Sequence, residues 1–146
     1  MAAGKKKLIL GECPKNAKIV LIGESPGATE IKLGRPFVGR AGRFLNSQLK
    51  KIGISRKKVY ITNIVKERCI GQPTLKQIKK YLPMLKKELK KVRPKVIVLL
   101  GNTAKKYAPR IKGIKYLKLP HPAAAMRFPK QRKIFERGIK KLKEYC

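Results

Sequence analysis

Two short apolar runs, AKIVLIG at 17–23 and PKVIVLLG at 94–101, constrain the fold of this chain more than any other feature. Both are apolar at nearly every position, and both end in glycine. This pattern indicates strands that are covered on both faces, as in a parallel sheet, because a strand with one face in water alternates apolar and polar residues. The rest of the chain therefore has to cover a parallel sheet.

Strand and helix patterns alternate along the remaining sequence. Residues 57–65 (KKVYITNIV) and 113–120 (GIKYLKLP) predict two further strands. Thr74 is a candidate N-cap for the longest helix, in which Pro83 is expected to cause a kink or a break. Helices are predicted over 40–54, 75–92, 102–108 and 131–145, and loops over 67–73 and 121–130. The alternation predicts an α/β fold with a small, mainly parallel sheet of four strands, in a single domain that spans residues 1–146.

The charge of the chain is strongly unbalanced. It has 39 lysines and arginines against seven acidic residues, a formal net charge of +32 at pH 7. The acids are all glutamates, at positions 12, 24, 30, 67, 88, 136 and 144. Such a field attracts polyanions, which favours nucleic acid as a partner over an anionic membrane surface. A lysine-rich thermophile proteome would explain the many lysines, but it explains the scarcity of acids less well.

The sequence shows no export or membrane signal and no metal-binding pattern. No segment approaches the ~18 apolar residues of a membrane span, and MAAGKKKLIL is not a secretory signal, so a soluble, cytoplasmic protein is expected. The three cysteines are Cys13, Cys69 and Cys146, with no C-x-x-C pair, and the single histidine lies far from them in sequence. Neither a disulfide framework nor a zinc site is indicated.

Polar residues follow the predicted strands at points that should meet in space. A stretch rich in Gly and Pro, GESPGATEIKLGRPFVGRAG at 23–42, follows the first strand. Asn63 lies near the end of the second strand, and His121 follows the fourth. Ligands of open α/β sheets bind at the carboxyl ends of the strands, so these three signals predict one site. Taken singly, each residue has an ordinary structural explanation: a turn for Asn63, packing for His121 and a core position for Phe37.

The sequence resembles a known superfamily over residues 17–130. GESPGATEIKLGRPFVGRAGRFLN, VYITNIVK, RPKVIVLLGNTA and HPAAAMR are similar, in this order, to the motifs of the uracil-DNA glycosylase superfamily. Among its branches they are most similar to the thermophile-rich, iron–sulfur branch called family four. The resemblance implies a three-layer α/β/α sandwich with a central parallel sheet. It also implies an enzyme of base excision repair that flips a deaminated base, most simply uracil, out of DNA and hydrolyses its N-glycosidic bond.

The resemblance also implies roles for individual residues. Phe37 matches the residue that stacks on uracil, Asn63 the residue that reads it, and His121 the catalytic histidine that stabilises the leaving base. Glu24 and Glu30 match glutamates of the related branch; Glu24 is expected near the sugar or holding the loop, and Glu30 beside the base. Both are counted as catalytic, with a solvated acid or an ion pair to Arg35 or Arg40 as the alternative. The substrate-binding loop is completed by Gly23, Ser25 and Gly27, and Ser25 stands where other branches place an Asp or Asn that activates water.

Contacts with DNA are expected around the loop that follows His121. Met126 is the candidate for the wedge that fills the gap left by a flipped base, because Ala125 occupies the usual wedge position. Basic residues for phosphate contact are Arg35, Arg40, Arg127 and Lys130. The small Ala125 leaves open whether the substrate is double- or single-stranded. A monomer that hands its product to downstream repair proteins is expected.

The chain departs from the related branch at the iron–sulfur cluster. That branch uses four cysteines, whereas this chain offers Cys13 and a slightly displaced Cys69, with Tyr81 near the expected fourth position and Cys146 at the far end. Four thiolates are the normal requirement, so no cluster and no other cofactor is expected. Packing by Tyr81 and Leu82 is expected to replace the structural role of the cluster.

Three alternatives remain open at the level of sequence. The preferred base can be hypoxanthine or another deaminated base, because the sequence does not give the width of the pocket. The domain can be a nucleic-acid-binding module that has lost catalysis, although the joint presence of the five matched residues argues against this. A nucleotide- or phosphate-binding protein would rest on the Gly-rich loop alone, without a G-x-x-x-x-G-K-[ST] motif.

Overall fold

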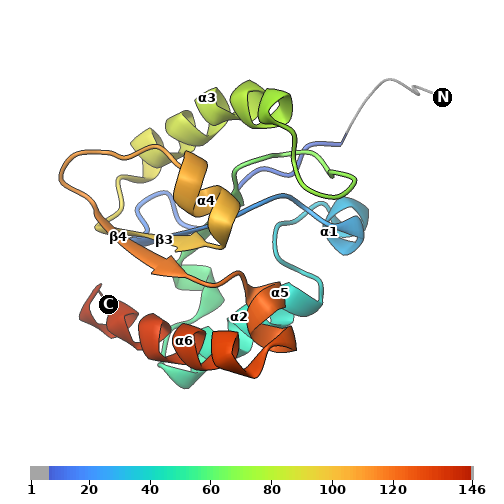
Figure 1. Ribbon diagram of the computed structural model, residues 1–146. Helices are drawn as coiled ribbons and strands as arrows, with labels where there is room; N and C mark the ends of the chain where they lie inside the picture. Colours follow the sequence, from blue (N-terminus) through green and yellow to red (C-terminus); the bar gives the residue numbers. More distant parts are fainter. Residues whose placement is uncertain (1–6, 146) are drawn as a thin grey trace.

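A four-stranded parallel sheet forms the centre of the molecule, in a computed structural model that describes residues 7–145 (Figure 1). The strands are β1 (Ile19–Gly23), β2 (Tyr60–Asn63), β3 (Val96–Leu100) and β4 (Lys115–Leu119). Their order in the sheet is β2-β1-β3-β4, and every neighbouring pair is parallel. The predicted parallel sheet of four strands is therefore confirmed.

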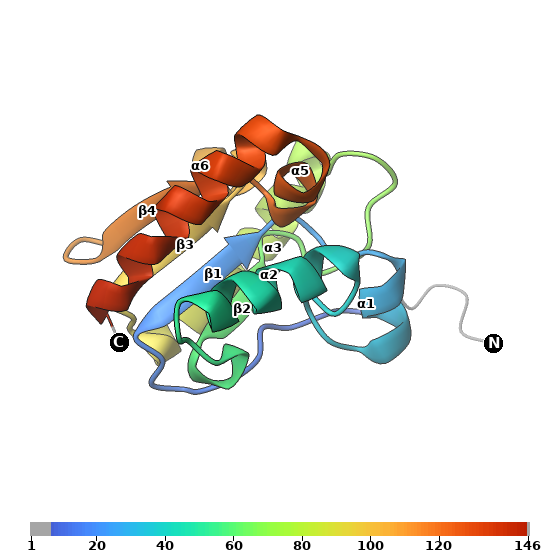
Figure 2. The same ribbon diagram turned by 90° about the horizontal axis from the view of Figure 1, so that it is seen from below.

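Helices cover both faces of the sheet. They are α1 (Ala28–Leu33), α2 (Arg40–Lys51), α3 (Leu75–Val92), α4 (Asn102–Tyr107), α5 (Pro122–Arg127) and α6 (Pro129–Ile139), with 3-10 turns at Arg56–Lys58 and Lys140–Tyr145. Figure 1 shows α3 and α4 on one side of the sheet and α2, α5 and α6 on the other, and Figure 2 shows α2 and α6 running across the second face. The three-layer α/β/α sandwich is confirmed.

The apolar runs serve two separate cores because successive side chains of a strand point to opposite faces. In β1, Val20 and Ile22 pack towards α3 and α4, while Ile19 and Leu21 pack towards α2, α5 and α6. The five residues of β1 and of β3 are all buried. Burial on both faces is the reason that neither run shows polar alternation.

The longest helix is stabilised at its start as the sequence predicts. Thr74 accepts a hydrogen bond from the amide of Gln77 at 3.1 Å, and the Gln77 side chain accepts one from the amide of Thr74 at 2.9 Å, which is a capping box. Pro83 lies inside α3, which continues from Leu75 to Val92 without a break. The packing of Ile78, Leu85 and other apolar residues against the sheet keeps the helix intact through the proline.

Several element boundaries differ from the prediction. The expected loop at 121–130 contains helix α5, because Pro122 takes the first helical position and an alanine-rich segment follows it. The expected helix at 40–54 ends at Lys51, where Gly53 adopts a left-handed conformation with φ of +80°. The terminal helix begins at Pro129 and changes to a 3-10 turn at Lys140. None of the helices within residues 7–145 has both the length and the apolar character to cross a membrane.

Candidate active site at the carboxyl ends of the strands

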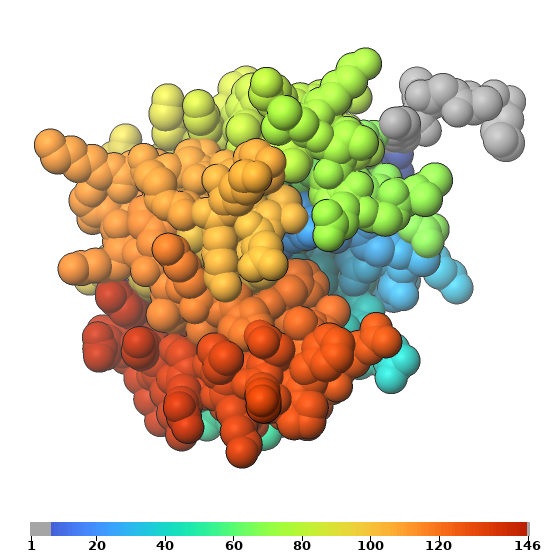
Figure 3. Space-filling model, viewed as in Figure 1, coloured from blue at the N-terminus to red at the C-terminus, as the bar shows by residue number. Residues whose placement is uncertain are grey.

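The connections of the sheet create a switch point at β1. From β1 the chain first adds β2 on one side, and then β3 and β4 on the other, so the direction of winding reverses at β1. Open α/β sheets bind ligands at such a switch point, outside the carboxyl ends of the strands. In Figure 3 the blue chain after β1 lies between the gold α4, the green loop after β2 and the orange segment around α5.

Gly23, the last residue of β1, brings Phe37 and Asn63 together. A methyl group added at Gly23 would lie 2.4 Å from the Phe37 ring and 2.6 Å from Oδ1 of Asn63. Both distances are too short for any side chain, so the absence of a Cβ at this position allows the ring and the amide to meet. Two residues that lie 26 positions apart in sequence therefore share one wall of the predicted site.

Asn63 is held by its backbone, while the oxygen of its side chain has no partner among residues 7–145. Its side chain is 2% exposed, and Oδ1 makes no hydrogen bond within that part of the chain. The Nζ of the buried Lys66 donates to the Asn63 carbonyl at 2.8 Å. A buried acceptor without a partner costs free energy, which suits a group that awaits a ligand with a donor.

His121 lies next to Phe37 with one defined tautomer. The two ring centroids are 5.9 Å apart, with an angle of 30° between the planes. The amide of Ala123 donates to Nδ1 of His121 at 3.1 Å, so Nδ1 is unprotonated in the neutral ring and Nε2 carries the hydrogen. The pKa of His121 is lowered from its ordinary value of 6.5, because the effect of burial exceeds the opposing effect of the negative charge of Glu24. The ring is therefore neutral at pH 7 and presents an Nε2–H donor.

Glu24 lies at the same end of the sheet and is tied to α4. Its Oε2 accepts a hydrogen bond from the hydroxyl of Thr103 at 2.7 Å, and its carbonyl accepts one from the amide of Val65 at 2.9 Å. The carboxylate is half-buried and close enough to His121 to affect the titration of that residue. Its second oxygen has no hydrogen bond recorded within residues 7–145.

Glu30 uses its carboxylate to organise the loop that carries Phe37. One oxygen accepts from the amide of Gly27 at 2.9 Å, and the other accepts from the amides of Val38 and Gly39 at 2.9 and 2.7 Å. Of the two ion pairs considered as alternatives, the one to Arg35 is replaced, because Arg35 binds Glu12 through two hydrogen bonds of 2.9 and 2.7 Å. The half-buried Ser25 lies between this loop and β1.

A buried network of charged residues connects β2 with α3. Lys66 is fully buried and donates to Thr62 at 2.5 Å and to the carboxylate of Glu88 on α3. Glu88 also accepts from the Tyr60 hydroxyl at 2.7 Å and from the amide of Gly11 at 2.7 Å. Burial and the Glu88 carboxylate raise the pKa of Tyr60. The network links the N-terminal segment, β2 and α3 directly behind Asn63.

The candidate DNA-contacting residues lie on the exposed surface around α2, α5 and α6. Arg40, Arg127 and Lys130 are exposed, and Met126 on α5 is half-buried. Sequence analysis missed Phe128, which is 50% exposed directly after α5 and lies under the guanidinium of Arg127, 5.5 Å from the ring centroid.

The side chains of residues 7–145 do not form a ligand set for an iron–sulfur cluster. No group of three or more His, Cys, Asp and Glu side chains within residues 7–145 is close enough to hold a metal ion, and Cys146 lies outside the described residues. Cys13 is exposed, and Cys69 lies beside the carbonyl of Glu67. The sequence suggested that packing replaces the cluster. Tyr81 is 2% exposed, burial and the nearby carboxylate of the buried Glu67 raise its pKa, and the Glu67 side chain accepts a hydrogen bond from Gln77 at 3.3 Å.

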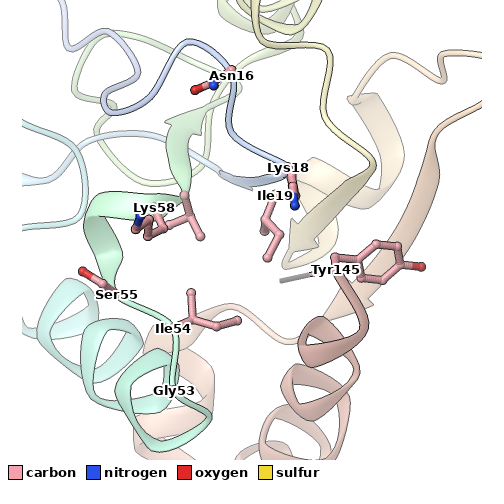
Figure 4. Close-up of a pocket in the computed structure, with 9 residues that line it drawn as sticks. Asn16, Lys18, Ile19, Gly53, Ile54, Ser55, Lys58 and Tyr145 are labelled. Atoms are coloured by element: carbon pink, nitrogen blue, oxygen red, sulfur yellow. The ribbon is translucent and has the colours of Figure 1, made fainter.

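A hollow of about 470 Å³ lies at the opposite end of the sheet (Figure 4). Lys18, Lys58 and Tyr145 line it together with Ile54 and Ser55, near the amino ends of β1 and β2. It contains none of the residues that the sequence singled out. The candidate site residues therefore do not line this hollow.

Five of the seven glutamates make internal contacts. Glu12 pairs with arginines, Glu24 with Thr103, Glu30 with loop amides, Glu67 with Gln77 and Tyr81, and Glu88 with Lys66. Few carboxylates are thus left at the surface to offset the basic residues. The acids in the loops, Glu12, Glu24 and Glu67, and Glu30 of α1 are therefore used for internal contacts in a chain of charge +32.

Comparisons with known proteins identify the family and the fold. A family model described as the uracil DNA glycosylase superfamily matches residues 10–143. A type-4 uracil-DNA glycosylase of Archaeoglobus fulgidus is 34% identical over 166 residues, which cover 97% of this chain and 83% of the relative. Another, from Sulfurisphaera tokodaii, is 36% identical over 159 residues, covering 92% of this chain and 72% of the relative. The fold is similar to the solution NMR structure of a candidate uracil DNA glycosylase from Methanosarcina acetivorans, with a TM-score of 0.59, 15% identity and coverage of 94% of this chain and 98% of that one.

Proposed function

Because this chain belongs to the uracil DNA glycosylase superfamily, we propose that it is a monofunctional uracil-DNA glycosylase, which removes uracil from DNA and leaves an abasic site. The observation that carries this proposal is the meeting of three groups at the end of β1: the Phe37 ring, the Asn63 amide and the His121 imidazole. Each of them offers what a flipped pyrimidine needs. No lysine is singled out as a nucleophile, which favours hydrolysis without strand cleavage.

Asn63 supplies the base selectivity. Its Oδ1 accepts from N3–H of uracil and its amide NH₂ donates to O4. Cytosine presents the reverse pattern, with an acceptor at N3 and a donor at C4, so an amide in fixed orientation rejects it. The buried Oδ1 without a partner and the hydrogen bond from Lys66 to the backbone support this assignment.

His121 stabilises the departing base. When the bond between C1′ and N1 breaks, its electron pair stays with uracil and spreads over N1 and O2. The Nε2–H of the neutral His121 donates to O2 as this charge develops. The hydrogen bond from Ala123 to Nδ1 fixes the required tautomer, so the donor is in place before the reaction begins.

Glu24 acts on the sugar side. The C1′ centre becomes oxocarbenium-like in the transition state, and a carboxylate nearby stabilises this cation. Water then bonds to C1′ and loses a proton, while the uracil anion takes up a proton. Ser25 can hold this water but is a poor base, so we infer a dissociative order of events in which bond cleavage precedes the attack of water.

Base entry requires local rearrangement around Phe37. This residue is only 6% exposed and also belongs to the core that packs against α2. Stacking on aromatic rings contributes about 1–3 kcal/mol per base, which helps to offset the cost of flipping and of making room. Glu30, with its carboxylate bound to loop amides, acts in this scheme by shaping the loop beside the base.

The partner is DNA, held by the basic surface. We assign phosphate contacts to Arg40, Arg127 and Lys130, and to Arg35, whose exposed guanidinium also pairs with Glu12. We assign the wedge to Met126, with the exposed Phe128 beside it. We also infer a monomer without an iron–sulfur cluster in a cytoplasmic setting, and an iron assay on anaerobically purified protein tests the cofactor inference.

The test is release of free base from oligonucleotides that contain uracil, hypoxanthine, or thymine opposite guanine, in single- and double-stranded form. The wild-type protein is compared with Asn63→Ala and with Asn16→Ala, an exposed asparagine at the far end of the sheet. Uracil release that is lost only in Asn63→Ala supports the proposal. Release of hypoxanthine alone would overturn the substrate, and intact DNA binding without release of any base would leave a binding module.

A further inference from the structure

The backbone of Phe37 is held in an unusual conformation. Its φ is +49°, in the left-handed region that side chains other than glycine rarely adopt. Such a conformation costs of order 1–3 kcal/mol and persists only where the surroundings enforce it. The turn that carries the stacking residue therefore depends on contacts from elsewhere in the chain.

Arg56 supplies contacts on the carbonyl side of this turn. Its two terminal nitrogens donate to the carbonyls of Pro36 and Phe37. One of them also donates to Oδ1 of Asn46 at 3.2 Å, and the other lies 3.6 Å from the carboxylate of Glu12. The Arg56 side chain is 13% exposed, so these contacts are made largely away from water.

The opposite side of the turn is also constrained. A Cβ on Gly42 would lie 1.9 Å from the Phe37 carbonyl oxygen, so α2 packs directly against this peptide. The amides of Val38 and Gly39 donate to Glu30. Arg56 thus holds the carbonyls while Glu30 holds the next two amides, and the peptide of Phe37 is fixed between them.

We propose that Arg56 is a positioning residue for base stacking, which keeps the Phe37 ring at the end of β1 by binding the carbonyls of Pro36 and Phe37. The inference rests on the proposed function, since it takes Phe37 as the surface on which the flipped base stacks. Only a planar guanidinium presents two donors at the spacing that two successive carbonyls require. A lysine offers one compact charge and reaches both carbonyls poorly.

A double-mutant cycle between Arg56 and Phe37 tests the proposal. Arg56→Met is expected to lower kcat/KM for uracil release by about 10- to 100-fold, because a displacement of the order of 1 Å at a reacting site has effects of this size. In a Phe37→Ala background the same substitution should change kcat/KM by less than about threefold, because no ring remains to be positioned. Arg56→Lys should recover part of the activity.

Arg110→Met is the matched control. Arg110 also donates to two backbone carbonyls, those of Ala108 and Lys105 at 3.1 and 2.6 Å, but these lie at the far end of α4. Its loss should leave kcat/KM near the wild-type value. Equal losses from Arg56→Met with and without Phe37, or no loss at all, would overturn the positioning role.

Hydrogen exchange separates this proposal from the proposed function. Arg56→Met should speed exchange at the amides of Val38 and Gly39 relative to both the wild type and Arg110→Met. Unchanged exchange rates at these two amides would contradict the proposal that Arg56 stabilises the turn at Phe37. A wild-type protein that releases no base would refute the proposed function, and the exchange rates would still report whether Arg56 holds the turn.

Discussion

Gly23 and Asn63 are register partners at the last position of the parallel ladder between β1 and β2. The pairing places the amide of Asn63 directly across from a residue without a side chain. The Phe37 ring and Oδ1 of Asn63 both lie within 2.6 Å of the position that a Cβ on Gly23 would take, so both groups depend on the absence of a side chain there.

We expect Gly23→Ala to abolish most of the activity while leaving a folded protein. The added methyl would displace the Phe37 ring or the Asn63 amide, with a loss of kcat/KM of about 100-fold and a loss of stability of about 1–3 kcal/mol. Steady-state kinetics and urea unfolding measure the two effects. Val20→Ala, on the same strand but in the core beneath α3, should lower stability comparably and keep its activity.

The single histidine makes the tautomer directly observable. Proton–nitrogen correlation spectra of the imidazole should show His121 with hydrogen on Nε2 and with a midpoint below the ordinary value of 6.5. Because the folded pKa is lower than the unfolded one, the unfolded chain binds more protons between the two values, and stability should rise with pH across that window. A midpoint above 6.5, or hydrogen on Nδ1, would contradict the assignment.

Removal of Lys66 should be costly because it leaves the Glu88 carboxylate without its buried cation. We expect Lys66→Met to lower the free energy of unfolding by about 3–5 kcal/mol, as measured in urea. The double variant Lys66→Met/Glu88→Gln should regain part of this loss, since a neutral amide replaces the uncompensated charge. If the double variant is as unstable as the sum of the two single ones, the pair is not coupled.

Tyr81 provides a second pH signature. Burial and the Glu67 carboxylate raise the pKa of Tyr81 to about 12. Because the folded value exceeds the unfolded value of about 10, the contribution of Tyr81 to stability is complete below pH ~10 and is lost as the pH rises towards ~12. Difference titration of tyrosinate absorbance between wild type and Tyr81→Phe should place the missing step near the upper value, and a step near 10 would argue against the contact with Glu67.

Binding to undamaged DNA should depend steeply on salt. Each phosphate contact contributes about one unit to the slope of log K against log salt concentration. We therefore expect Arg40→Ala, Arg127→Ala and Lys130→Ala each to reduce the slope by about one unit. Lys90→Ala, at the exposed end of α3, should leave the slope unchanged; equal effects from all four would mean that DNA binds without a preferred face.

Sequence reasoning located the residues at the ends of the strands. The Gly-rich stretch from Gly23, Asn63 and His121 were predicted to converge because each lies at or near the end of a predicted strand, and parallel strands end at one edge. The structural roles of Arg56 and Lys66 were missed, because the sequence does not distinguish a buried basic residue from the other basic residues among the 39. Their burial depends on Glu12 and Glu88, which lie 44 and 22 positions away in the chain.

The conformation of the loops also could not be predicted from the sequence pattern. Glu30 could be assigned to the site by its motif, but its binding to the amides of Val38 and Gly39 depends on how residues 34–39 turn. Helix α5 was missed within the predicted loop 121–130, although His121 caps the helix and Pro122 takes its first position.

The basic residues and the glutamates differ in their roles, and they should therefore differ in how well they tolerate substitution. Loss of one exposed lysine removes a small share of a large positive field, whereas loss of a glutamate such as Glu30 or Glu88 releases several backbone or side-chain donors at once. A complete substitution scan of this chain should therefore find its exposed lysines largely replaceable and the five glutamates with internal contacts nearly immutable.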